Sequence, residues 1–100
     1  MTADAPDIAD EAGPRRSATI ANRRGLHARA AAKFVKLAAT FDAQVMVGHR
    51  GTEVSGLSIM GLMMLAAAPG CCIDLRASGN QAEQALDALC ELIDRKFDED

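Results

Sequence analysis

Hydrophobic and polar residues alternate along four short stretches of the chain, at residues 17–21, 43–48, 52–55 and 71–78. Alternation with a period of two places successive side chains on opposite faces of a strand. In the last stretch one face is formed by Cys71, Ile73, Leu75 and Ala77. An apolar face backed by a mostly polar one is typical of an antiparallel sheet that is buried on one side. The turn at residues 49–51 predicts that the second and third strands pair as a hairpin.

Three other stretches carry apolar residues at helical spacing, at about residues 28–40, at 58–67 and from residue 80 onward. The first has an apolar stripe formed by Ala31, Phe34, Val35, Ala38 and Phe41. The last has one formed by Ala82, Ala85, Leu86, Leu89 and Ile93. In the short middle helix, the inward positions are Ile59, Leu62 and Ala66. Leu57, Met60 and Met63 then lie on other faces.

Residues with good capping side chains precede two of these helices. Ser58 can accept a hydrogen bond from an early backbone N–H of the middle helix. Asn80, with Glu83 three residues later, resembles a capping box for the last helix.

The order of elements is β-α-β-β-α-β-α, which predicts an α+β domain. The economical packing is a four-stranded antiparallel sheet whose helices all cover one side. Residues 1–14 combine acids, alanine, proline and glycine without periodicity, and we interpret them as a flexible acidic N-terminal tail. Residues 15–97 form the domain, and the acidic residues 98–100 are expected to fray.

Charge is distributed unevenly in this chain of net charge −3. All charged residues between positions 12 and 41 are basic: Arg15, Arg16, Arg23, Arg24, Arg29, Lys33 and Lys36. On the helix over residues 28–40, the basic ridge (Arg29, Lys33 and Lys36) lies opposite the apolar stripe and is expected to be exposed. It can be an ordinary solvated face or a surface for anions or acidic partners. Nucleic-acid binding is disfavoured by the acidic net charge and the absence of tryptophan and tyrosine.

The N-terminus has no signal-peptide pattern, and no apolar run is long enough to span a membrane. We therefore expect a cytoplasmic protein without membrane insertion. Cys71, Cys72 and Cys90 are too few and too irregularly spaced for a disulfide framework or a zinc site, so small buried side chains in a reducing compartment are expected. The sequence implies no metal and no cofactor.

His27 follows the break at Asn22-Arg23-Arg24-Gly25 and lies where the first helix begins. Backbone N–H groups at a helix start lack partners and attract anions. This end of the helix also favours a neutral imidazole, which is a nucleophile near neutral pH. If His27 attacks a phosphoryl donor, the phosphoryl group can be held by the backbone amides of Ala28 and Arg29 and by the Arg29 guanidinium.

A solvent-exposed histidine in a turn is the alternative, and spacing does not decide between the two. Metal binding is a poorer interpretation, since His49 is the only other histidine and lies in a different turn. No general base or second carboxylate is aimed at His27 in the sequence pattern. The chain is therefore expected to be a carrier and not a complete enzyme, with its partners supplying the catalysis.

The segments Gly25-Leu26-His27-Ala28-Arg29 and Ser58-Ile59-Met60-Gly61-Leu62-Met63 resemble the HPr family of histidine phosphocarrier proteins. These proteins belong to the bacterial phosphoenolpyruvate-dependent phosphotransferase system. The resemblance covers roughly residues 15–95. It implies an open-faced β-sandwich with sheet order 1-4-2-3 and three helices on one face.

The resemblance also implies partners and roles. His27 would accept a phosphoryl group on Nδ1 from enzyme I and pass it to a histidine of an EIIA-type protein, with Arg29 supporting the phosphate. Ser58 would be a regulatory site for HPr kinase/phosphorylase, besides being an N-cap. The partner surface would consist of Arg24, Lys33 and Lys36 together with the apolar patch (Leu57, Ile59, Met60 and Met63). A monomer is expected.

Two residues depart from the usual family pattern. Ala30 stands where many members have proline, and Leu57 where many have lysine. These departures and the acidic N-terminus fit the nitrogen-related branch as well as the sugar branch. The chain could then be a regulatory protein, whose phosphorylation state controls binding to signalling or transcription partners.

Overall fold

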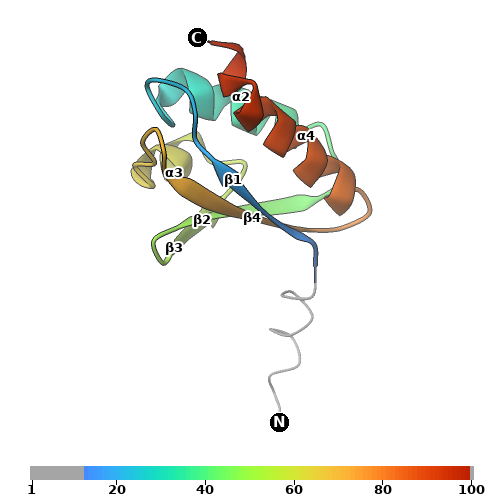
Figure 1. Cartoon of the computed structure of the whole chain (residues 1–100). Helices are drawn as coiled ribbons and strands as arrows, with labels where there is room; N and C mark the ends of the chain where they lie inside the picture. The colour runs from blue at the N-terminus through green and yellow to red at the C-terminus, as the bar shows by residue number, and fades with distance from the viewer. Residues whose placement is uncertain (1–12, 100) are drawn as a thin grey trace.

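The computed structural model describes residues 13–99, which form a four-stranded antiparallel sheet with helices packed on one side (Figure 1). The strands are β1 (Arg15–Thr19), β2 (Gln44–His49), β3 (Thr52–Ser55) and β4 (Cys72–Ser78). Their spatial order is β1-β4-β2-β3, so the predicted α+β fold and sheet order are confirmed. The predicted N-terminal tail falls almost entirely on residues 1–12, outside the described residues.

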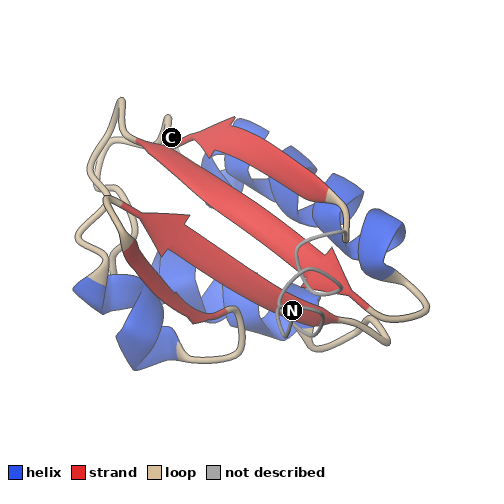
Figure 2. Ribbon diagram, turned by 90° about the horizontal axis from the view of Figure 1, so that it is seen from below, coloured by secondary structure: helices blue, strands red, loops and turns tan. Residues whose placement is uncertain are grey.

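The helices are α2 (Ala28–Ala38), α3 (Ile59–Met64) and α4 (Ala82–Asp94), followed by a short 3-10 turn, η1 (Lys96–Asp98). Figure 2 shows them behind the sheet, whose other face is open. Within residues 13–99, none of these helices is long and apolar enough to cross a membrane.

Alternation along β4 explains how the sheet buries one face. Ile73, Leu75 and Ala77 are buried under the helices, and the residues between them lie on the open face. The buried Ala18 of β1 pairs with Ile73 on the neighbouring strand β4. Because register in a sheet decides which side chains point inward, this pairing fixes the core.

The apolar stripes of the two long helices complete the core. In α2 the fully buried side chains include Ala31 and Phe34, and in α4 they include Leu86, Leu89 and Ile93. Alanine at several of these positions allows the helices to approach the sheet closely. The predicted stripes are therefore confirmed at their centres, while Val35 and Phe41 at the edge of the first stripe are only partly buried.

Two local predictions for the helices were wrong. Ile59 and Ala66 do not face inward, since both are exposed. Leu62 is buried as predicted, and Leu65, which was not predicted, is buried too. Ala66 lies beyond the end of α3 at Met64 and has a positive φ of 54°, so helical spacing does not apply to it.

Asn80 does not cap α4. Gln81 occupies the N-cap position without a side-chain capping bond, since its Oε1 accepts from the Asp42 N–H at 2.7 Å. The Asn80 amide donates to the Asp42 carboxylate at 2.9 Å.

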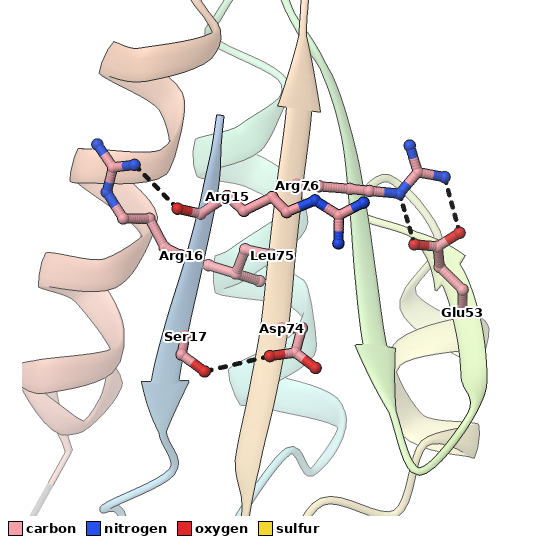
Figure 3. A pocket seen from close by; sticks show the side chains of 7 residues that line it. All are labelled: Arg15, Arg16, Ser17, Glu53, Asp74, Leu75 and Arg76. Carbon is pink, nitrogen blue, oxygen red and sulfur yellow. Dashed lines mark hydrogen bonds and ion pairs between the residues drawn. The ribbon is translucent and has the colours of Figure 1, made fainter. Parts of the chain in front are cut away.

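The open face of the sheet is polar, and Figure 3 shows a hollow on it. There Arg76 makes a bidentate ion pair with Glu53 at 2.7 and 2.8 Å, and the Ser17 hydroxyl donates to Asp74 at 3.1 Å. Arg76 stabilises the charge of Glu53 and thereby lowers the pKa of that carboxyl. None of the site residues predicted from the sequence lines this hollow. Cys72 also lies exposed on this face, so the expectation that all three cysteines are buried was wrong.

Candidate functional site

A tight loop between β1 and α2 presents His27. Gly25 has a positive φ of 68°, and its carbonyl accepts bonds from the Asn22 side-chain amide at 2.8 Å and the His27 N–H at 2.9 Å. The Asn22 side chain is fully buried. A buried amide that bonds the loop backbone fixes the path of the chain into the helix.

The same loop is anchored to the segment that follows α3. The Leu26 N–H donates to the Ala67 carbonyl at 3.1 Å, and the Leu26 side chain is buried. Since α2 also packs on α3, the two segments that resemble HPr motifs meet at one end of the sheet (Figure 1).

His27 is itself the N-cap of α2. Its Nδ1 accepts a hydrogen bond from the Arg29 backbone N–H at 3.2 Å. An imidazole nitrogen that accepts a hydrogen bond carries a lone pair and no proton. The geometry therefore assigns the proton of the neutral ring to Nε2 and leaves Nδ1 as the nucleophilic atom.

Nε2 of His27 faces the carboxylate of Glu99, at 2.9 Å from Oε2 and 3.1 Å from Oε1. Glu99 also accepts a bond from the Asn22 amide at 3.1 Å. The prediction that no carboxylate is aimed at His27 was wrong. The pKa of Glu99 is lowered, first by the Asn22 hydrogen bond and then by that of His27.

Glu99 reaches the ring because the C-terminal strap, defined as residues 95–99, folds back over the start of α2. Phe97 is fully buried in the core, and its carbonyl accepts a bond from the Lys33 ammonium at 2.7 Å. The expectation that this end frays was wrong for Asp98 and Glu99, while Asp100 lies outside the described residues. A phenylalanine directly after the last helix was the one sequence signal for the strap.

The basic residues lie in two environments. Two exposed arginines, Arg24 and Arg29, line a depression beside His27 together with Ala28. Lys36 is exposed further along α2. Lys33 is different, because its ammonium is bound to Phe97 and its side chain is partly buried. The basic ridge expected from helical spacing is therefore interrupted at Lys33.

Ser58 caps α3, as predicted: its hydroxyl oxygen accepts from the Gly61 N–H at 2.9 Å. The side chains of the apolar patch are all exposed, with Met60 at 73%. Met64, exposed at 74%, extends this surface. It was missed in the sequence, although its position four residues after Met60 places it on the same face of the helix. Large apolar side chains gathered on one exposed surface are typical of protein contact sites.

A histidine whose Nδ1 carries a lone pair, set at a helix N-terminus beside exposed arginines, can take up a phosphoryl group. Among residues 13–99, Glu99 is the one side chain that is hydrogen-bonded to the ring. The fold and the site together fit the class of small phosphocarrier proteins.

Comparison with known proteins gives the family. A family model described as the PTS HPr component phosphorylation site matches residues 14–95. The phosphocarrier protein HPr of Pseudomonas putida is 53% identical over 87 residues, covering 86% of this chain and 97% of that protein. The phosphocarrier protein NPr of Shewanella violacea is 46% identical, covering 84% and 92%. This chain belongs to the HPr family of the phosphotransferase system, and it is a phosphocarrier protein.

Solved structures of HPr proteins have the same fold as this chain. HPr-C-His from Thermoanaerobacter tengcongensis superposes with a TM-score of 0.83 at 40% identity, covering 87% of this chain and 98% of that one. A second structure from that organism, an HPr dimer, gives a TM-score of 0.69 at 44% identity over 80% of this chain and 92% of that one.

Proposed function

We propose that this protein accepts a phosphoryl group on Nδ1 of His27 from phosphorylated enzyme I. It then passes the group to a histidine of an EIIA-type protein in the bacterial cytoplasm. The observation that carries the proposal is the hydrogen bond from the Arg29 N–H to Nδ1 together with the placement of Nε2 against Glu99. This arrangement leaves the lone pair on Nδ1, which the Arg29 N–H contacts at the start of α2.

The residues beside the ring suit a phosphoryl group. The Arg29 N–H that contacts Nδ1 can shift its hydrogen bond to a phosphoryl oxygen, and the amide of Ala28 lies in the same first turn. The exposed guanidinium groups of Arg24 and Arg29 can add charge-assisted bonds. These groups hold the phosphate but provide no acid or base for its transfer, so the partner enzymes supply the rest of the catalytic site.

Partner docking is assigned to the exposed surface beside His27. The apolar patch would bury against a partner, while Arg24 and Lys36 would attract an acidic surface. A relay protein has to release each partner quickly, and a small surface with electrostatic steering provides fast association without tight binding. Lys33 is a less direct contributor because it is bound to Phe97.

The test is phosphorylation with enzyme I and phosphoenolpyruvate, followed by mass spectrometry of the intact protein. The expected result is the gain of one acid-labile phosphate in the wild type and its loss in His27→Ala. His49→Ala is the matched control, because His49 lies in β2 with its Nδ1 near the Cys72 carbonyl and should leave labelling unchanged. A wild-type protein that gains no phosphate would refute the proposal.

Ser58 is proposed as a second, regulatory phosphorylation site, used by an HPr kinase/phosphorylase. Its hydroxyl is partly exposed and caps α3 next to the apolar patch. A phosphate there would be favoured by the helix N-terminus and would place negative charge on the docking surface.

The corresponding experiment compares Ser58→Asp with Ser58→Ala in transfer from enzyme I. Aspartate retains the cap and adds the charge, whereas alanine removes the cap alone. Slower transfer in the aspartate variant only is the expected outcome. Equal rates in all three proteins would argue against regulation at Ser58.

A regulatory role in a nitrogen-related branch is a second candidate, favoured by the similarity to the NPr of Shewanella violacea. The phosphorylated and unphosphorylated forms would then differ in their binding to a signalling or transcription protein. Pull-downs with both forms separate this role from simple phosphoryl relay. We expect the protein to act as a monomer without binding nucleic acid, which light scattering and electrophoretic mobility shift would check.

A further inference from the structure

The C-terminal strap lies mostly beyond residue 95, where the match to the family model ends. Its last described residue nevertheless contacts the ring of His27 through two carboxylate oxygens. The strap is therefore a part of this chain's site that the family match does not cover. Glu99 contacts the ring directly, and it also accepts a hydrogen bond from the buried Asn22.

The backbone of the strap is strained. Lys96, Phe97 and Asp98 have φ values of 59°, 56° and 60°, three successive left-handed residues without a glycine. Such a conformation persists only where surrounding contacts determine it. Here the contacts are the buried Phe97 ring, the Lys33 bond to its carbonyl and the Arg95–Asp98 ion pair at 3.0 Å. Together they hold the Glu99 carboxylate at His27.

We propose that Glu99 is a positioning residue for phosphoryl transfer: it holds the proton on Nε2 of His27, and it balances the positive charge that the ring acquires when Nδ1 is phosphorylated. This inference rests on the proposed acceptance of phosphate by His27. In the unphosphorylated protein Glu99 orients a neutral ring, and in the phosphorylated protein it pairs with a cation.

The chemical step shows why the carboxylate matters. The Nδ1 lone pair forms a bond to phosphorus while the bond between phosphorus and the donor breaks, and the donor retains that electron pair. The Nε2 proton remains on His27, so the ring becomes a phosphorylated imidazolium. Without Glu99 this cation would face Arg24 and Arg29, the charged groups that line its depression. The Lys33 ammonium, bound to the Phe97 carbonyl, is a further positive charge that acts on Glu99.

The experiment measures the charge of the ring directly. Wild type, Glu99→Gln and Glu99→Ala are phosphorylated with enzyme I and phosphoenolpyruvate, and the titration midpoint of the phosphohistidine is followed by NMR. Removing the carboxylate should lower that midpoint by roughly half to one pH unit, the scale of a unit charge pair near a protein surface. Glu91→Gln is the matched control, because Glu91 is an exposed α4 residue that pairs only with Arg95 in the described chain.

A second measurement separates positioning from a merely structural role. In the unphosphorylated protein the Nε2–H of His27 should exchange slowly with water in wild type and Glu91→Gln. Glutamine at position 99 can still accept this bond, so Glu99→Gln should retain part of the protection, and Glu99→Ala should lose it.

The outcomes are distinguishable. Phosphorylated variants whose midpoints equal that of the wild type would overturn the role of Glu99 and leave the carrier function standing. A wild type that takes no phosphate on His27 would overturn both proposals. A shift of the midpoint in Glu91→Gln as large as that in Glu99→Gln would also refute the specific pairing, because any acidic residue would then serve.

Discussion

Gly25 packs against the backbone of Ala67 so closely that a β-carbon on Gly25 would lie 2.5 Å from the Ala67 carbonyl oxygen. That same oxygen accepts the hydrogen bond from the Leu26 N–H. The site loop and the segment after α3 are therefore in direct backbone contact two residues before His27. Glycine is required at position 25 for two reasons: its positive φ and its close contact with Ala67.

Gly25→Ala should destabilise the protein by roughly 2–5 kcal/mol. About 1–2 kcal/mol is the cost of the left-handed conformation for a residue with a β-carbon, and overpacking adds about 1–3 kcal/mol. Phosphate uptake should also fall, because the loop has to move to relieve the contact. Urea unfolding and labelling by enzyme I are the measurements.

Gly51→Ala is the control for this prediction. Gly51 also has a positive φ, 83°, but nothing lies within 4 Å of its β-position. It should show the conformational cost alone and label normally. If both variants lose equal stability, the contact with Ala67 is not the cause.

Most of the fold was predictable because it depends on periodicity. The alternation over β4 predicted which of its residues are buried, and the stripe of α4 was correct from Ala82 to Ile93. These patterns depend on the burial of many residues, so one residue that departs from the period does not change the predicted element. Ends of elements depend on single side chains, and Asn80 illustrates this: a good capping residue was diverted by Asp42, which is distant in sequence.

The part of the site that escaped prediction depends on the backbone of the strap. Non-glycine residues rarely adopt left-handed conformations, so no local sequence pattern predicts three left-handed residues in succession. Asp98 and Glu99 consequently resembled a charged tail, and Lys33 resembled a free residue of the basic ridge. Only the packing of Phe97 into the core explains both contacts.

Phe97→Ala should release the strap. Truncating a buried phenylalanine costs about 3–5 kcal/mol, and the strained backbone has no other apolar anchor among the described strap residues. We expect lower stability in urea and loss of protection of the His27 Nε2–H. Leu57→Ala, at an exposed residue, should change stability by less than about 0.5 kcal/mol. Continued protection of Nε2–H in Phe97→Ala would show that the strap stays in place without its anchor.

Acid should weaken the contact of Glu99. Its pKa in the folded protein lies below the ordinary value of 4.5, owing to the hydrogen bonds from Asn22 and His27. A lowered pKa means that the stabilisation is fully present above pH 4.5 and is lost as the pH falls through the folded-state pKa. Urea unfolding of wild type and Glu99→Gln between pH 3 and 7 should show a difference that shrinks below about pH 4.5. A difference that stays constant over this range would contradict the prediction.

Met60→Glu should weaken partner binding without affecting the fold. Met60 is 73% exposed on α3, so its replacement removes little from the core and should change stability by less than about 0.5 kcal/mol. A carboxylate in the apolar patch must be desolvated when a partner docks, and it also repels an acidic surface, so transfer from enzyme I should require a higher carrier concentration. Gln44→Glu adds the same charge on the exposed face of β2 and should leave the concentration dependence unchanged. If both variants slow transfer alike, net charge and not the apolar patch governs the encounter, and the loss should then disappear at high salt.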